Sequence, residues 1–283
     1  MDSYQKNLYE KFERFRPSPS YPTYPPYHKG LYLEDYFIER YSSENLDVSR
    51  YLIPVSWTTC YVENKINGLQ QLIDSLDRTK KYFTVAQHDD AIREILPPDT
   101  LCFNAGGNGG GVPIPLICSP ISTEEIEDVD RDIFCSFVGS ITHPIRSYLL
   151  QSLGNKEGYY FSARNWTSSV SDGELQNFIS ITKRSIFALV PRGYGRSSFR
   201  LYEVMQLDAI PVFVYDEPWF PFEGDLDWDS FSVRVHVSQI EKIDQILKSI
   251  DVDTINSMRR SLSSVWSENF NMNSVYKIIL SKI

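Results

Sequence analysis

The sequence has no long hydrophobic run and few cysteines, and both absences narrow the possible classes of protein. None of its 283 residues lies in an apolar stretch of 18 residues, which excludes a helical membrane span. Residues 1–15 are polar and lack the apolar segment of a secretory signal, so we expect a cytoplasmic protein. Only four cysteines are present, and they form no C-x-x-C pair, so neither a disulfide scaffold nor a zinc site is expected.

The chain also lacks an excess of positive charge. Its formal net charge is -9 at pH 7, whereas a dedicated nucleic-acid binder needs a basic face to displace phosphate counterions. We therefore expect no nucleic-acid partner. The motif G-x-x-x-x-G-K-[ST] is absent, which excludes a P-loop. A small anion held at a local basic site, or a neutral partner, fits this composition better.

The N-terminal residues differ in composition from the rest of the chain. Residues 16–30 carry five prolines and three tyrosines, a composition that excludes a helix and favours an extended backbone. We predict that residues 1–30 form an extended Pro/Tyr-rich arm that packs on the domain through its aromatic side chains. A proline-rich recognition tail is the alternative.

From about residue 50, short apolar runs alternate with segments of helical periodicity. Strands are predicted at 51–55, 82–86, 101–103, 114–118, 133–138, 158–162, 186–190 and 210–215. Helices are predicted at 62–76, 90–96, 143–153, 171–184, 199–207, 253–266 and after 238, those at 171 and 238 starting with capping boxes.

This alternation indicates an α/β protein with parallel sheets covered by helices. The acidic residues 123–132 divide it into two Rossmann-like halves that face each other across a cleft. We predict an N-terminal domain at 31–130 and a C-terminal domain at 131–283.

Two glycine-containing loops are candidates for phosphate binding. In residues 105–111 the glycines do not follow G-x-G-x-x-G, and a strand is predicted after them, so a flexible loop at the mouth of the cleft is the better interpretation. Residues 183–200 differ, because they hold five basic residues and no acidic one, whereas residues 201–230 hold eight acidic residues and no basic one.

The basic segment has the order of elements that binds a diphosphate. A strand is followed by a glycine-containing loop and by Ser197 and Ser198, which can cap the next helix and present its free amides. Arg196 and Arg200 lie near that helix start, and Glu203 lies one turn inside, where it can accept hydrogen bonds from ribose hydroxyls. A solvated basic turn with a serine cap is the alternative.

Residues 187–233 resemble the exostosin family (glycosyltransferase family 47). The family combines a strand ending in P-x-G, a loop with S-x-R-x-x-E, a turn into I-P-V and a segment of the form P-F…L-D-W-x-x-F. The corresponding positions here are Pro191, Gly193, Ser198, Arg200, Glu203, Ile210-Pro211-Val212, Pro221-Phe222, Leu226-Asp227-Trp228 and Phe231. Residues 137–146 and 82–89 match the family more weakly, and the compact chain is similar to a microbial or viral type of member.

The resemblance implies a GT-B fold, with the acceptor-side domain at 31–130 and the nucleotide-sugar-binding domain at 131–283. It also implies transfer of a sugar from a UDP-linked donor with inversion at the anomeric carbon. It implies that the diphosphate is held by Ser197, Ser198 and Arg200, with Gly139 and Arg146 as a second contact, and the ribose by Glu203. Two departures from the family pattern are expected: Asp208-Ala209 stands where glycine and cysteine are usual, and we expect no secretory anchor.

An inverting transferase needs a group that takes the proton of the acceptor hydroxyl. His88 and Asp89 follow the predicted strand 82–86, and ligands bind beyond the carboxyl ends of parallel strands. We predict Asp89 as the base, with His88 as the alternative and helix capping as the structural interpretation of Asp89. Further candidate contacts to the donor sugar or the acceptor are His143, Tyr194 and Glu217.

A divalent metal is not expected. Asp225-Leu226-Asp227 has the D-x-D form that some transferases use for manganese, but in the GT-B arrangement arginines and a helix terminus replace the metal. No cofactor is therefore predicted.

The resulting hypothesis is an inverting glycosyltransferase that uses UDP-xylose or UDP-galactose and an oligosaccharide or glycoprotein glycan acceptor. One alternative is an inactive scaffold that binds nucleotide or glycan and supports a partner transferase. Another is a hydrolase of nucleotide sugars.

Overall fold

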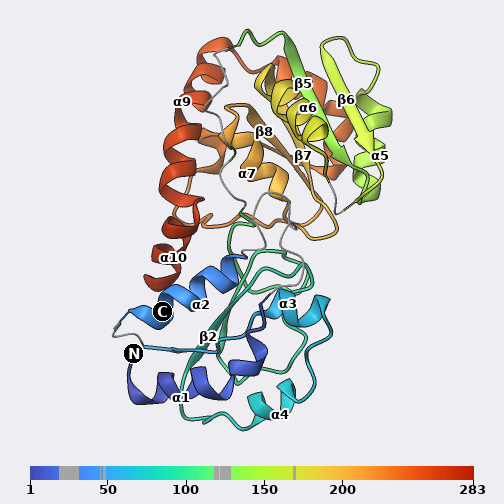
Figure 1. Cartoon of the computed structure of the whole chain (residues 1–283). Helices are drawn as coiled ribbons and strands as arrows, with labels where there is room; N and C mark the ends of the chain where they lie inside the picture. The colour runs from blue at the N-terminus through green and yellow to red at the C-terminus, as the bar shows by residue number, and fades with distance from the viewer. Residues whose placement is uncertain (19–31, 45, 47–48, 118–120, 122–128, 168–169) are drawn as a thin grey trace.

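The computed structural model in Figure 1 describes residues 1–18, 32–44, 46, 49–117, 121, 129–167 and 170–283. It contains two sheets in which every neighbouring pair of strands is parallel. The first sheet has the order β1-β2-β3-β4, formed by β1 (Tyr51–Leu52), β2 (Tyr82–Ala86), β3 (Leu101–Asn104) and β4 (Val112–Pro113). The second has the order β6-β5-β7-β8-β9, formed by β5 (Ile133–Ser140), β6 (Tyr159–Arg164), β7 (Ser185–Pro191), β8 (Ile210–Tyr215) and β9 (Val233–His236). The predicted α/β class is confirmed, and the two parallel sheets are consistent with a GT-B fold.

The helices surround the two sheets. The N-terminal half contains α1 (Ser3–Lys11), α2 (Leu33–Ser43), α3 (Trp57–Val62) and α4 (Leu69–Asp74). The C-terminal half contains α5 (Pro144–Leu153), α6 (Asp172–Lys183), α7 (Phe199–Gln206), α8 (Ile243–Lys248) and α9 (Val252–Asn269). In Figure 1, α6 and α7 lie in front of the second sheet and α5 lies behind it, where it contacts the 3-10 helix Val237–Lys242. Among the described residues, no helix is long and apolar enough to cross a membrane.

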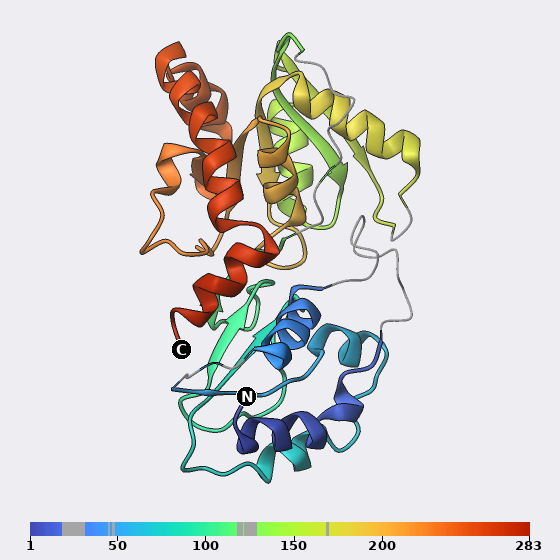
Figure 2. The same ribbon diagram turned by 60° about the vertical axis from the view of Figure 1, so that its left-hand side comes forward.

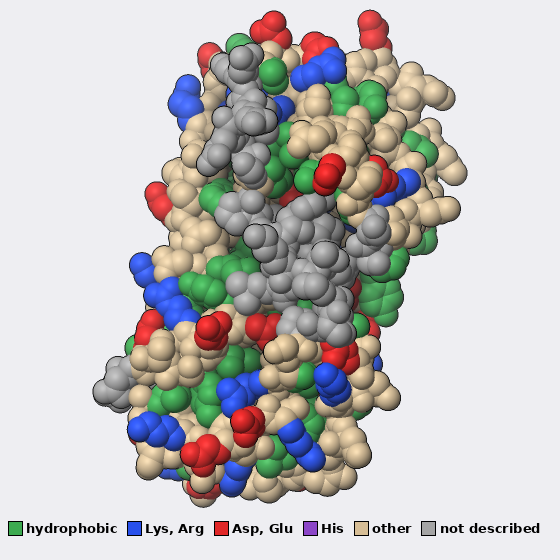
Figure 3. All heavy atoms as spheres, viewed as in Figure 1, with side chains coloured by type: hydrophobic (Ala, Val, Ile, Leu, Met, Phe, Trp, Pro, Cys, Tyr) green, Lys and Arg blue, Asp and Glu red, His purple; other side chains and the backbone are tan. Residues whose placement is uncertain are grey.

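The last helix, α10 (Met272–Leu280), returns to the N-terminal half and packs on α2 (Figure 2). The rings of Tyr276 and Phe37 are 4.8 Å apart, and the Arg40 guanidinium lies 4.3 Å from the Tyr276 ring centre. One hydrophobic core cluster therefore extends from the second sheet to α2 and β2. A second cluster, centred on Trp57, holds α1, α3 and α4 against the first sheet. On the face shown in Figure 3, basic and acidic side chains are intermixed over both halves.

The prediction of an extended arm over residues 1–30 is wrong for its first part. Residues 3–11 form α1, whose N-cap is the Asp2 side chain, and residues 13–15 form a 3-10 helix. Leu8 and Phe12 are buried in the core of the N-terminal half, so this segment is helical because it packs. Residues 19–30 of the predicted arm lie outside the described residues. The domain boundary near residue 130 stays a prediction, since most of residues 123–132 are also outside them.

Three predicted elements differ because a backbone feature interrupts the pattern. Of the helix predicted at 62–76, only α4 at Leu69–Asp74 forms, since α3 ends at Val62 and Asn64 and Gly68 then adopt positive φ. Residues 90–96 form no helix but mostly irregular backbone, and Ala91 has a φ of 55°. No strand forms over the described part of the segment predicted at 114–118, where Pro115 cannot donate to a neighbouring strand; the short strand β4 precedes it at Val112–Pro113, and residue 118 lies outside the described residues.

The capping box predicted at residue 238 is also wrong, because His236 caps a 3-10 helix there. The capping box at Ser171 is confirmed, with both of its reciprocal hydrogen bonds present.

Candidate active site

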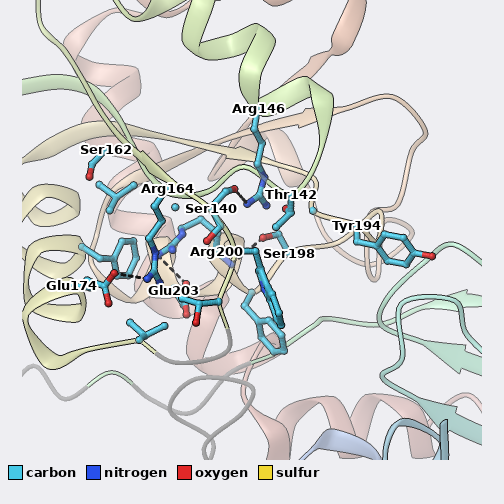
Figure 4. Close-up of a pocket in the computed structure, with 18 of the residues that line it drawn as sticks. Ser140, Thr142, Arg146, Ser162, Arg164, Glu174, Tyr194, Ser198, Arg200 and Glu203 are labelled. Carbon is cyan, nitrogen blue, oxygen red and sulfur yellow. Dashed lines mark hydrogen bonds and ion pairs between the residues drawn. The ribbon is translucent and has the colours of Figure 1, made fainter. Parts of the chain in front are cut away.

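The candidate site lies at the point in the second sheet where the strand order reverses. The first strand of this half, β5, is flanked by β6 and β7, so the chain leaves it in opposite directions. A crevice forms at the carboxyl ends of strands at such a point, and ligands bind there. A cavity of about 670 Å³ occupies this position (Figure 4). Gly139 from the end of β5 and Gly193 from the loop after β7 both line it.

Arg146 places a buried positive charge in the cavity wall. It extends from α5, and its guanidinium donates to the carbonyl oxygens of Ser140 at 2.7 Å, Pro191 at 3.1 Å and Arg192 at 3.0 Å. These bonds tie the ends of β5 and β7 together. Burial and the neighbouring Arg200 lower the pKa of Arg146 to about 10. No ion pair to a carboxylate is present for Arg146 within the described part of the chain, so its charge is available to compensate an anionic ligand.

The start of α7 supplies the second part of the cavity wall. Ser198 is the N-cap, and its hydroxyl accepts a hydrogen bond from the Arg200 amide at 3.3 Å. The Arg200 guanidinium lies 3.7 Å from the ring centre of Phe178 and 3.1 Å from a carboxylate oxygen of Glu203. Burial raises the pKa of Glu203, and the positive charge of Arg200 opposes that rise. Ser197, Ser198, Arg200 and Glu203 all line the cavity.

The sequence analysis missed a third arginine in the cavity. Arg164 is the last residue of β6 and forms an ion pair with Glu174 (Figure 4). The Glu174 carboxylate also closes the capping box of α6 by accepting from the Ser171 amide and hydroxyl at 2.8 Å. The rule that ligands bind at the carboxyl ends of strands would have found Arg164, but the predicted strand ended at residue 162.

Asp89 reaches the same cavity from the N-terminal half. It follows β2 and lines the cavity. Burial, and secondarily the charge of Asp90, raise the pKa of Asp89 to about 6, against the opposing charge of Arg192. Its Oδ1 atom lies 2.5 Å from the position that a Cβ atom would take at Gly195. The carboxylate therefore lies against the loop after β7, of which Gly193, Tyr194 and Gly195 line the cavity.

The two candidate histidines do not line the cavity. His88 accepts a hydrogen bond from the Asp90 amide at 3.2 Å through Nδ1, and its ring lies 5.0 Å from the ring of Tyr61. His143 is the N-cap of α5 and accepts from the Ile145 amide at 3.3 Å. Burial lowers the pKa of both rings. Each histidine is thus used in a local turn or cap.

The remaining predicted contacts lie apart from one another. Tyr194 lines the cavity with 61% of its surface exposed and points toward the N-terminal half in Figure 4. Arg196 and Glu217 form an ion pair with each other, and neither of them lines the cavity. The Arg196 guanidinium lies 6.0 Å from the ring centre of Trp219.

Because Arg196 does not line the cavity, we predict that Arg196→Ala changes the affinity for UDP by less than about threefold. Its partly exposed ion pair with Glu217 also contributes little to stability, so the variant should fold. Calorimetric titration of the variant measures this directly. A loss of tenfold or more would show that Arg196 contacts the diphosphate.

The D-x-D residues have other partners. Asp225 pairs with Lys282 at 2.8 Å, and the Asp227 side chain accepts from the Asp229 amide at 3.1 Å as the cap of a 3-10 helix. Within the described ranges, no three His, Cys, Asp or Glu side chains cluster as metal ligands.

The comparison with known families agrees with this geometry. The Exostosin GT47 domain matches residues 105–250, which is more than half of the chain and includes β5 to β9. The chain belongs to the exostosin family of glycosyltransferases. The resemblance carried by residues 187–233 is confirmed by this match.

Several proteins of this family are similar to the chain. A probable glucuronosyltransferase of rice (Oryza sativa subsp. japonica) is 38% identical over 169 residues, which cover 55% of this chain and 39% of the relative. A probable glycosyltransferase of Arabidopsis thaliana is 30% identical over 147 residues, covering 52% and 27%. Exostosin-1 of Drosophila melanogaster is 29% identical over 105 residues, covering 37% and 14%. The matched regions thus span well under half the length of these relatives.

Proposed function

We propose that this exostosin-family chain transfers a sugar from a UDP-linked donor to a hydroxyl group of an oligosaccharide or glycoprotein glycan, with inversion and without a metal ion. The observation that supports the proposal most is the shared cavity. Arg146, Arg200 and the capped start of α7 line one side of it, and the Asp89 carboxylate lines the other. An anionic leaving group and a proton acceptor thus have separate places at one cleft.

In the proposed reaction the diphosphate lies against Arg146 and Arg200, and Glu203 accepts hydrogen bonds from the ribose hydroxyls. Asp89 takes the proton of the acceptor hydroxyl as its oxygen attacks the anomeric carbon. The bond from that carbon to the diphosphate breaks, and the two arginines and the α7 amides stabilise the charge that develops on UDP. Attack from the side opposite the leaving group inverts the anomeric centre.

Asp89 suits the role of base better than His88 for two reasons. It lines the cavity, whereas the Nδ1 atom of His88 is engaged by a backbone amide. A pKa of about 6 also leaves the Asp89 carboxylate mostly deprotonated, yet more basic than an ordinary aspartate, at neutral pH.

The donor sugar belongs to the proposal as well. UDP-xylose and UDP-galactose are the donors that we propose first. The probable glucuronosyltransferases among its relatives add UDP-glucuronic acid to the set to be tested.

The test is a transfer assay with each of these UDP-sugars and a panel of glycan acceptors, in EDTA and then with manganese. We expect acceptor-dependent release of UDP in EDTA and a product of inverted anomeric configuration by NMR. UDP release that does not depend on acceptor would indicate a hydrolase. UDP binding without release in either condition would indicate a scaffold and would contradict the proposal.

A further inference from the structure

The glycine-rich residues 105–111 have a definite place between the two halves of the molecule. A Cβ atom at Gly106 would lie 2.3 Å from the Asp89 Cα atom, and one at Gly109 would lie 2.6 Å from the Asp90 carbonyl oxygen. On the other side, a Cβ atom at Gly107 would lie 2.9 Å from Cβ of Arg196. Backbones can approach this closely only where side chains are absent. Asn108 carries the one side chain in residues 106–111, so it is the residue to examine.

Asn108 bonds to both halves at once. Its backbone amide donates to the Asp89 carbonyl oxygen at 3.0 Å, and its Nδ2 atom donates to Oδ1 of Asp90 at 3.3 Å. Across the cleft, its Oδ1 atom accepts from the Arg192 guanidinium at 3.1 Å, and Nδ2 also donates to the Tyr194 carbonyl oxygen at 3.3 Å.

The residue that Asn108 meets across the cleft is itself fixed. The buried Arg192 guanidinium forms a two-pronged ion pair with Asp216 at 2.8 and 2.9 Å and donates to the Tyr194 carbonyl oxygen at 2.9 Å. Nearby, the Ser197 amide donates to the Gly106 carbonyl oxygen at 3.3 Å. These bonds join the loop after β7, which carries the phosphate-binding residues, to the loop after β3.

We propose that Asn108 is a positioning residue that sets where the Asp89 carboxylate lies relative to the donor. This inference rests on the proposed function, in which Asp89 is the base. Asn108 bonds to residues on each side of the proposed reaction centre, whereas the hydrogen bonds and ion pairs of Arg146, Arg200 and Glu203 are to other residues. Its loss should therefore impair proton transfer and leave nucleotide binding intact.

The expected effect is a split between rate and affinity. A displacement of about 1 Å at a reacting group can lower a rate by about 100-fold. We expect Asn108→Ala to lower kcat by about 10- to 100-fold while the Kd for UDP changes by less than about twofold. Asn108→Asp keeps the shape of the side chain and the acceptor for Arg192 but puts a like charge beside Asp90. It should lower kcat in the same range, and it replaces the alanine variant if that variant does not fold. Asn155→Ala, at an exposed turn, is the matched control and should change neither value.

The decisive experiment combines Asn108→Ala with Asp89→Asn in a double variant. If Asn108 acts through Asp89, adding Asn108→Ala to the Asp89→Asn variant lowers the residual rate by less than about twofold. A further loss as large as that in the wild-type background would overturn the inference, as would an Asn108→Ala enzyme with unchanged kcat. Either result leaves the proposed function standing. A wild-type chain that transfers no sugar overturns the proposed function and the inference together.

Discussion

Asp89→Asn is expected to lower kcat for sugar transfer by about 10²- to 10⁴-fold, the usual contribution of a general base. The amide has nearly the shape of the carboxylate but cannot take a proton. The Kd for UDP should change by less than about threefold, because Asp89 contacts the loop at Gly195 and not the arginines of the phosphate site. His88→Asn is the comparison variant, and a larger loss there than at Asp89 would transfer the role of base to the histidine.

The dependence on pH has a defined direction. Burial raises the pKa of Asp89 to about 6, so the base becomes protonated, and kcat/KM falls, as the pH decreases through about 6. Asp89→Asn should remove this acid limb. A raised pKa also means that the folded protein holds the Asp89 charge at a cost, and this cost is present above pH 6 and absent below pH 4. The variant is therefore expected to have a higher Tm than the wild type at pH 8, which separates lost chemistry from lost folding.

Arg200→Ala is expected to weaken UDP binding by about 10- to 150-fold. Hydrogen bonds to charged groups contribute about 1.5–3 kcal/mol, and 1.4 kcal/mol corresponds to a factor of ten in Kd. The loss for UDP should exceed the loss for uridine, since uridine lacks the diphosphate.

Arg234→Ala is the matched control for Arg200→Ala. It removes the same charge from a surface arginine that pairs with Glu223 and Asp229 outside the cavity. Equal losses for UDP and uridine in Arg200→Ala would contradict a contact between Arg200 and the diphosphate.

Two central strands were predictable because each is a short run of apolar residues in the sequence. The predicted strands 82–86 and 210–215 match β2 and β8 to the residue, since each is a short apolar run buried in a parallel sheet. The helix start at Ser171 was predictable because a capping box is a local signal. Helix periodicity alone failed at 62–76, where Gly68 interrupts an apolar pattern that would otherwise continue.

The candidate site was predictable only in part, because its contacts depend on the tertiary structure. Ser198, Arg200 and Glu203 lie within about one and a half turns at the start of α7, so their spacing already brings them together. The sequence could not show that Arg196 pairs with Glu217 instead of lining the cavity, or that Arg164 enters it from β6. The choice between His88 and Asp89 likewise required knowing which side chain faces the cleft.

The account is tested most directly by calorimetric titration of the wild type and of Glu203→Ala with UDP, GDP and CMP, in EDTA and then with manganese. The proposed site predicts selective binding of UDP in EDTA, unchanged by manganese and weakened at least tenfold in Glu203→Ala. Binding that requires manganese, that does not distinguish UDP from GDP, or that survives in Glu203→Ala would contradict it.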